Sequence, residues 1–323
     1  MTSKYNEFDR SSLELEALAQ RQSDYGVESI LPLQAILPTE TMETVAGRLV
    51  RAKDAGGARI LMMGAHVLRS GAQRYLIELM DMGLVSCIAT NGASAIHDFE
   101  LALIGRTTES VARYIADGRF GFWRETGWLN AVIRDAAANR LGLGEAVGKA
   151  VSEGDFLYKD LSLFAAAYTR SIPVTVHVGI GHDIIHQHPD CDGGALGETS
   201  YRDFLIFAQA LTRLSGGVVM NFGSAVMAPE VFLKALSMVR NKARQKGETV
   251  RNFTTLVCDL HNMPVNYAHE AQKTNPNYYF RPWKTMLVRT VAEGGESFYQ
   301  RGTHCETIPQ LWTAAARQTA SAR

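Results

Sequence analysis

The sequence has few cysteines, and none of them are spaced as metal ligands. The 323 residues include four cysteines, at positions 87, 191, 258 and 305, which stand far apart in the chain. No Cys-x-x-Cys pair occurs, so neither a zinc ribbon nor a disulfide framework is indicated. Scattered free thiols fit a reducing compartment, and we expect a cytoplasmic protein.

The chain also lacks an excess of either charge and lacks long apolar runs. Its 33 basic side chains balance its 33 acidic ones, so charge gives no reason to expect nucleic acid or an anionic membrane as a partner. The first 26 residues contain no apolar core of a secretory signal. No run approaches the roughly 18 apolar residues that span a bilayer. We therefore expect a soluble protein without a membrane partner.

What the sequence does contain is an alternation of apolar strands and amphipathic helices. Strands are predicted over 59–66, 84–90, 172–181, 217–226, 252–260 and 284–291. Helices are predicted over 40–55, 70–83, 95–105, 200–216, 229–245 and 307–318. Apolar strands that are followed by helices predict an α/β fold, doubly wound around a mostly parallel sheet that is covered on both faces.

The domain organisation is predicted to be simple. Residues 1–26 form a polar N-terminal arm with a short helix around 13–19, and residues 27–323 form a single domain. No linker rich in proline, glycine or serine divides that domain. The segment 106–171 is more helical and is predicted to be an excursion from the sheet.

Small and polar residues follow the predicted strands at five places. These turns are Gly64–His66, Thr90–Ser94, Gly179–Asp183, Asn221–Ser224 and Asp259–Asn262. Ligands of open α/β sheets bind beyond the carboxyl ends of the strands, so the five turns favour a nucleotide site. The alternative is that glycine is common in such turns. No G-x-G-x-x-G follows a strand, so a nucleotide would be held by a different kind of loop.

Two further groups of residues allow more than one interpretation. His177, His182, His186 and His188 lie within twelve residues, but their spacing matches no zinc hydrolase motif, so hydrogen bonding is favoured over metal binding. Lys284 follows Pro282 and Trp283. A lysine among bulky apolar groups can become a nucleophile, although the local sequence favours a surface lysine with its stem along the aromatic neighbours.

Four stretches together resemble the deoxyhypusine synthase family, and most closely its bacterial deoxyhypusine synthase-like proteins. They read MMGAHVLRSGAQRYLIELMDMGLVSCIATNGASAIHDFELAL, IPVTVHVGIGHDIIHQH, GGVVMNFGSAV and RPWKTM, in the family's order, across most of residues 58–310. The resemblance implies a Rossmann-like NAD-binding domain without the usual glycine fingerprint. It also implies a homotetramer with active sites at subunit interfaces. In this family, NAD takes a hydride from the amine carbon of spermidine, and the aminobutyl group passes through an enzyme lysine to an acceptor lysine.

The resemblance also implies roles for individual residues. Lys284 would form the imine and Trp283 would be a wall of the amine pocket, while Asp183 would bind the adenosine ribose hydroxyls. The other cofactor contacts would be Gly64, Ala65, His66, Ser70, Thr90, Asn91, Gly92, Asp98, Gly223 and Ser224.

The chain departs from the family pattern around the substrate. The stretch AVMAPE lacks the family's histidine pair, and the acidic loop before the lysine is replaced by a longer one. Asp259 and Glu270 are the carboxylates available there for an amine. His66, His97, His182 and His261 are the acid–base candidates, because imidazole titrates near neutral pH.

The sequence therefore predicts an NAD-dependent transferase. It would oxidise a small amine, such as the polyamine spermidine, to an imine and transfer the alkylamine fragment to a protein or small-molecule acceptor. Three alternatives stay open: an NAD-dependent lyase or cyclodeaminase acting on an amino acid, a non-catalytic NAD-binding protein, and a metal-dependent hydrolase that uses the histidine cluster.

Overall fold

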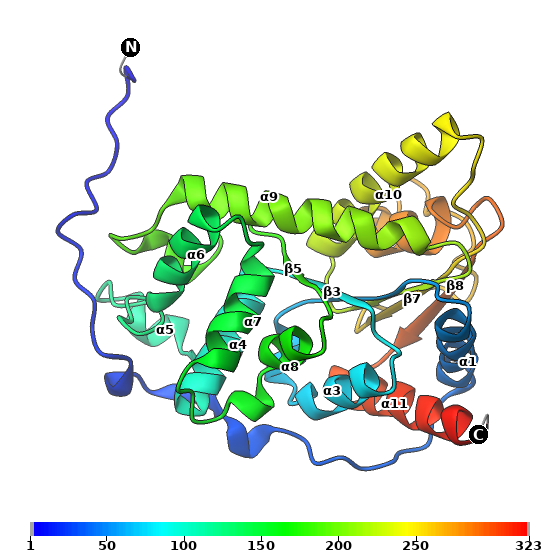
Figure 1. The fold of residues 1–323 in the computed structure, drawn as a ribbon, viewed down its shortest axis with the longest axis horizontal. Helices are drawn as coiled ribbons and strands as arrows, with labels where there is room; N and C mark the ends of the chain where they lie inside the picture. Colours follow the sequence, from blue (N-terminus) through cyan, green and yellow to red (C-terminus); the bar gives the residue numbers. More distant parts are fainter. Residues whose placement is uncertain (1–2, 322–323) are drawn as a thin grey trace.

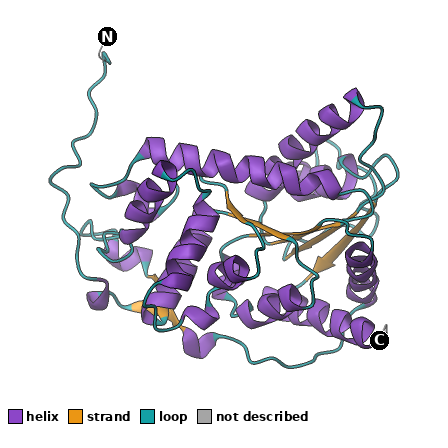
Figure 2. Cartoon of the chain, viewed as in Figure 1, coloured by secondary structure: helices purple, strands orange, loops and turns teal. Residues whose placement is uncertain are grey.

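The computed structural model describes residues 3–321, and its centre is a parallel sheet of six strands (Figures 1 and 2). The strands run in the order β5-β3-β2-β6-β7-β8. Their bounds are β2 Arg59–Met63, β3 Cys87–Thr90, β5 Val174–Val176, β6 Val218–Phe222, β7 Thr254–Asp259 and β8 Glu296–Arg301. This is the strand order of the Rossmann dinucleotide-binding fold, with the reversal between β2 and β6. The predicted doubly wound α/β fold is confirmed.

Helices cover both faces of the sheet. Their bounds are α1 Glu40–Asp54, α2 His66–Arg69, α3 Gln73–Asp81, α4 Gly92–Ile104, α5 Val111–Tyr114, α6 Trp128–Ala138, α7 Leu143–Glu153, α8 Leu163–Thr169, α9 Gly193–Ala210, α10 Met227–Gln245 and α11 His304–Ser321. Figure 1 shows α9 and α10 on one side of the sheet and α3 and α11 on the other. Within residues 3–321 no helix is long and apolar enough to cross a bilayer.

Strand β2 shows why the strands read as continuous apolar runs. Leu61 and Met63 pack in the core layer that includes α1 and α3. Ile60 and Met62 point to the opposite layer, where α9 and α10 supply Phe207 and other apolar side chains. Both faces are buried from Ile60 to Met63, so these four positions are all apolar and do not alternate with polar residues; only the first residue, Arg59, is polar.

The strand predicted over 284–291 is wrong. Residues Trp283–Arg289 form a π-helix, η7, and the last strand is β8. A short apolar run such as KTMLVRTV fits a buried helix as well as a buried strand, and periodicity alone does not separate the two. β8 lies at the sheet edge, and its residues are half-buried or exposed, so its sequence carries no apolar signal.

The N-terminal segment joins the packed body before residue 18, because Arg10 donates to the Cys191 carbonyl and Glu16 forms an isolated parallel bridge with Trp123. A three-residue 3-10 helix, Leu18–Gln20, stands where a helix around 13–19 was expected. Leu18 is buried with Tyr114 and Trp123. Strand β1, Ser23–Gly26, then pairs antiparallel with β4, Arg106–Glu109. Part of the segment that was predicted to be a polar arm therefore packs against the rest of the domain.

A buried ion pair connects this segment to α4. The guanidinium of Arg21 donates two hydrogen bonds to the carboxylate of Glu100, at 2.7 and 2.8 Å. Both side chains are 1% exposed. Burial by itself would raise the pKa of Glu100, but Arg21 and hydrogen bonds from Thr126 and Thr107 bring it below its ordinary value. The pair fixes the N-terminal segment beside the sheet.

Side chains of α9 cover the sheet edge at β5. The backbone N–H of Val176 donates to the Asp203 carboxylate at 2.7 Å. The hydroxyl of Ser200 accepts from the Val178 N–H at 3.1 Å and donates to the Val176 carbonyl at 2.8 Å. These bonds satisfy the outward backbone groups that a further strand would otherwise use.

Candidate functional site at the carboxyl ends of the strands

A cavity of about 650 Å³ opens at the carboxyl ends of β2, β3, β5 and β6. It is the crevice in which folds of this strand order bind dinucleotides. Four of the five predicted turns line it. The sequence-predicted residues that it brings together are Gly64, Ala65, His66, Asn91, Gly92, His97, His182, Asp183, Gly223 and Ser224.

The turns after β2 and β6 touch each other at the strand-order reversal. The N–H of Gly64 donates to the Phe222 carbonyl at 3.0 Å. A Cβ atom on Gly64 would lie 2.7 Å from the carbonyl oxygen of Gly223, and Gly223 itself has a φ of +67°. The close approach and the left-handed backbone explain why both positions are glycine.

The carboxylate of Asp183 lies over the start of α4. A Cβ atom on Gly92 would overlap Asp183 Oδ2. Burial raises the pKa of Asp183 to about 6, opposed by His182 and by a hydrogen bond from the Ala93 N–H. In the standard Rossmann arrangement a carboxylate at the end of the second strand binds the ribose. Here that strand, β3, ends at Thr90 and is followed by Asn91, and the loop after β5 places Asp183 beside this turn.

Three histidines around the cavity are held neutral. Burial lowers the pKa of His97 and of His177 to about 4, and burial with the nearby Arg69 lowers that of His66. His97 Nδ1 lies 2.7 Å from Thr107 Oγ1. Neutral imidazoles can accept protons from a bound ligand.

The histidine cluster at 177–188 is divided between the cavity and the loop that follows β5. His177 and His182 line the cavity. His186 Nδ1 accepts from the N–H groups of Gly181 and Asp183, and His188 Nε2 lies 2.7 Å from the Gly121 carbonyl. In the described chain, no three His, Cys, Asp or Glu side chains gather in a way that could hold a metal ion.

Three expected cofactor contacts, Ser70, Thr90 and Asp98, do not line this cavity. Thr90 is fully buried, and its hydroxyl donates to the Met63 carbonyl. Asp98 is buried and accepts from Ser162 and from the N–H groups of Leu163 and Phe164, at the start of α8. Asp98 therefore caps a helix, which corrects the expected contact with the cofactor. The sequence misled because Thr90 begins a turn that lines the cavity and Asp98 lies four residues beyond the end of that turn.

The predicted substrate residues are dispersed. Lys284 in η7 is 7% exposed, and its Nζ lies 3.9 Å from the centre of the Tyr278 ring. The indole of Trp283 donates to the Tyr267 carbonyl. Glu270 forms two hydrogen bonds with Arg289, and His261 Nε2 lies 2.8 Å from Asn277 Oδ1. None of the four predicted residues is among those that line the 650 Å³ cavity.

A second cavity, of about 430 Å³, adjoins the first and shares His66, Arg69 and Gly223 with it. Asp259, a predicted substrate residue, lines it, as does Ser70, whose hydroxyl donates to the Val67 carbonyl. It also contains residues that the sequence did not reveal: Asp24, Tyr25, Arg69 and His304. Arg69 follows the Gly64–His66 turn by three residues, and this closeness in sequence was the one available indication that it belongs to the site. Tyr25 and His304 come from opposite ends of the chain, and no local pattern connects them.

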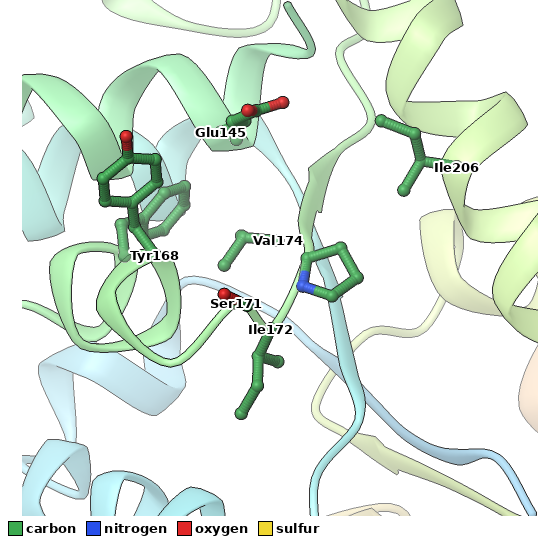
Figure 3. A pocket seen from close by; sticks show the side chains of 9 residues that line it. Glu145, Tyr168, Ser171, Ile172, Val174 and Ile206 are labelled. Atoms are coloured by element: carbon green, nitrogen blue, oxygen red, sulfur yellow. The ribbon is translucent and has the colours of Figure 1, made fainter.

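A separate cavity of about 290 Å³ lies at the amino end of β5 (Figure 3). Figure 3 shows the side chains of Tyr168, Ile172, Val174 and Ile206 around it, with Glu145 at one side. It lies at the opposite end of the strand from the predicted turns. None of the residues predicted to bind cofactor or substrate lines it.

Comparison with known proteins supports the fold but does not identify an activity or a substrate. No protein-family model matches the sequence, and no curated protein sequence is significantly similar to it. The ternary complex of AgrE with ornithine and NAD⁺ aligns over 88% of this chain and 34% of its own, at 14% identity and a TM-score of 0.51. The binary complex of a mutant AgrE with L-arginine aligns over 89% and 34%, at 16% identity and a TM-score of 0.50.

A provisionally assigned deoxyhypusine synthase from Entamoeba histolytica aligns over 87% of this chain and 90% of its own, at 11% identity and a TM-score of 0.44. The chain spans about a third of the length of the AgrE structures. The likeness to AgrE shows a shared Rossmann-like α/β fold.

Proposed function

We propose that the protein is an NAD-dependent enzyme that acts on a small amine or amino acid. The observation that carries the proposal is the carboxylate of Asp183 beside the end of β3. A Rossmann fold presents an acid to the adenosine ribose from the end of its second strand, and the position of Asp183 beside Gly92 in the cavity supports the same role for it. AgrE, which has this fold, was crystallised with ornithine and NAD⁺.

The residues around the 650 Å³ cavity fit NAD. Glycines at 64, 92 and 223 leave the cavity lined by backbone at these turns, and Asp183 can accept from two ribose hydroxyls. The same carboxylate would repel the phosphate of NADP. When bound, NAD would accept a hydride from the carbon that carries the amine.

The neutral histidines supply the proton transfer. An amine is protonated at neutral pH, and it must lose a proton before its carbon can give up a hydride. His66 lines both adjoining cavities and has a lowered pKa, so it is free to accept that proton. His97 and His182 line the first cavity and are further candidates.

Transfer to an acceptor is the finer form of the proposal. Lys284 is buried in the π-helix η7 against the Tyr278 ring, and the family resemblance makes it the lysine that would carry the transferred fragment. Trp283 packs beside it. An amino-acid lyase or cyclodeaminase is the second candidate, favoured by the mixed charges of the adjoining cavity. The homotetramer and the acceptor remain predictions from the family resemblance.

Calorimetry with NAD and NADP tests the cofactor. We expect NAD to bind more tightly than NADP. Asp183→Asn should lower the affinity for NAD by roughly tenfold or more, because a charge-assisted hydrogen bond to the ribose is lost. Asp160→Asn, an exposed carboxylate of the 3-10 helix Lys159–Leu161, is the matched control. Absence of NAD binding, or equal binding by the Asp183 variant, would contradict the proposal.

Lys284→Met separates the two reaction classes. If Lys284 carries the transferred fragment, borohydride trapping in the presence of spermidine and NAD adds mass to the wild type and none to the variant. If the chain is a lyase, neither protein is labelled and both retain turnover.

A further inference from the structure

The cavity of about 430 Å³ beside the cofactor crevice has a distinct charge pattern; we call it the His304 compartment. We infer that it binds a small amino acid with a basic side chain, with Arg69 on the carboxylate and with Asp259 and Asp24 on the ammonium groups. This inference rests on the proposed function, because it names the substrate class of the same site.

Arg69 is the cation of the compartment. Its guanidinium lies 3.4 Å from His66 Nε2 and forms no ion pair among residues 3–321. The side chain is partly buried and lines both the compartment and the cofactor cavity. A planar guanidinium without a carboxylate partner is suited to a bidentate contact with a carboxylate ligand.

Two carboxylates face the same space. Asp259, at the end of β7, is half-buried, and its Oδ1 accepts from the His261 N–H at 3.1 Å. Asp24 on β1 is exposed, at the rim of the compartment. Neither forms an ion pair within the described chain. With one guanidinium and two carboxylates, the compartment complements a ligand with one carboxylate and two ammonium groups.

The other titratable groups of the compartment do not alter this charge pattern. Burial lowers the pKa of His304, and burial with Arg69 lowers that of His66, so both are neutral near pH 7. Burial, with Glu28 nearby, raises the pKa of Tyr25 to about 12, so its hydroxyl keeps its proton. Cys305 is exposed at the edge.

Two buried polar atoms in these walls have no protein partner. They are the hydroxyl oxygen of Tyr25 and Nδ1 of His304. Leaving such an atom unpaired costs about 1–3 kcal/mol. The His304 ring also packs directly beneath Gly223, the residue shared with the cofactor cavity. A ligand here would therefore lie next to a bound cofactor.

The test is calorimetry with ornithine, norvaline and 1,4-diaminobutane, each with and without saturating NAD. Norvaline lacks the second ammonium group and 1,4-diaminobutane lacks the carboxylate. We expect ornithine to bind roughly tenfold or more tighter than either analogue, because each charged contact contributes about that factor. Arg69→Gln should lower the affinity for ornithine to a similar degree and leave the affinity for 1,4-diaminobutane unchanged. Asp259→Asn should lower the affinity for both compounds. Arg74→Gln, an exposed arginine of α3, is the matched control.

Tighter binding of 1,4-diaminobutane or spermidine than of ornithine would overturn the inference. So would an Arg69→Gln variant that loses NAD affinity and keeps ornithine affinity. If Arg69→Gln does not fold, the wild-type selectivity and Asp259→Asn decide the question. NAD binding without ornithine binding defeats the inference alone, whereas ornithine binding without NAD binding defeats the proposed function alone.

Discussion

The carboxylate of Asp183 lies where a side chain on residue 92 would begin. A Cβ atom on Gly92 would overlap Asp183 Oδ2. An alanine at position 92 is therefore incompatible with the present position of the Asp183 side chain. The loop after β5 and the start of α4 are thereby fitted to each other. This contact places the Asp183 carboxylate in the 650 Å³ cavity beside the end of β3.

Gly92→Ala should displace Asp183 and weaken NAD binding at least as much as Asp183→Asn does. The expected loss of stability is about 1–3 kcal/mol, the usual cost of overpacking a tight site. Thermal unfolding and calorimetry with NAD measure the two effects. Gly197→Ala in α9 is the control, because no atom lies within 4 Å of its added Cβ. It should stabilise the helix by up to about 1 kcal/mol.

Gly223→Ala should disturb the His304 compartment. Gly223 has a φ of +67°, and its added Cβ would collide with the His304 ring. Gly216→Ala shares the backbone penalty, with a φ of +71°, but meets no atom within 4 Å. In both variants the left-handed backbone should lower the free energy of unfolding by about 1–2 kcal/mol. Gly223→Ala should lower it further, because of the collision with His304. Equal losses in urea unfolding would show that His304 does not pack there as described.

Arg21→Met should destabilise the protein by about 3–5 kcal/mol, because it leaves the Glu100 carboxylate buried without its cation. The double variant Arg21→Met/Glu100→Gln should lose less than the sum of the single changes, since the two side chains share one interaction. Urea unfolding of the four proteins measures this coupling. Additive losses would mean that the N-terminal segment is not held by this pair.

Asp203→Asn should change how stability depends on pH. Burial raises the pKa of Asp203 to about 7, opposed by hydrogen bonds from Val176 and Gly144. Between its ordinary value near 3.8 and about 7, the folded state binds this proton and the unfolded state does not. The contribution of Asp203 to stability therefore falls as pH rises through this window.

The asparagine variant has no proton to lose at this site, so its stability relative to wild type should rise as pH increases from about 4 to about 7. Urea unfolding at several pH values gives the difference curve. Asp160→Asn should give a flat one. A flat curve for Asp203→Asn would show that this carboxyl ionises at its ordinary pH in the folded protein.

The sequence predicted the fold better than the site. Strands such as β2 and β6 are buried on both faces, so their apolar runs carry a strong signal. The edge strand β8 and the β1–β4 ribbon carry no such signal, because their residues are largely half-buried or exposed and do not form apolar runs.

Within the site, the turns were predictable because strand ends converge in a parallel sheet. Arg69, Tyr25 and His304 were not, because their proximity depends on how α2, β1 and α11 pack together. Asp98 was misassigned for the related reason that neighbours on a helix face different partners. Adjacency in sequence identified the turn but not the direction of each side chain.

The covering of β5 by Ser200 and Asp203 also bears on self-association. Open sheet edges recruit strands from other chains, which leads to shared sheets or to aggregates. At this edge the outward N–H groups of Val176 and Val178 are already bonded to α9. Copies of the chain that assemble on this side must therefore meet through helix surfaces. The side chains of Ser200 and Asp203, which complete the hydrogen bonding of β5, also prevent a strand of another chain from pairing with it.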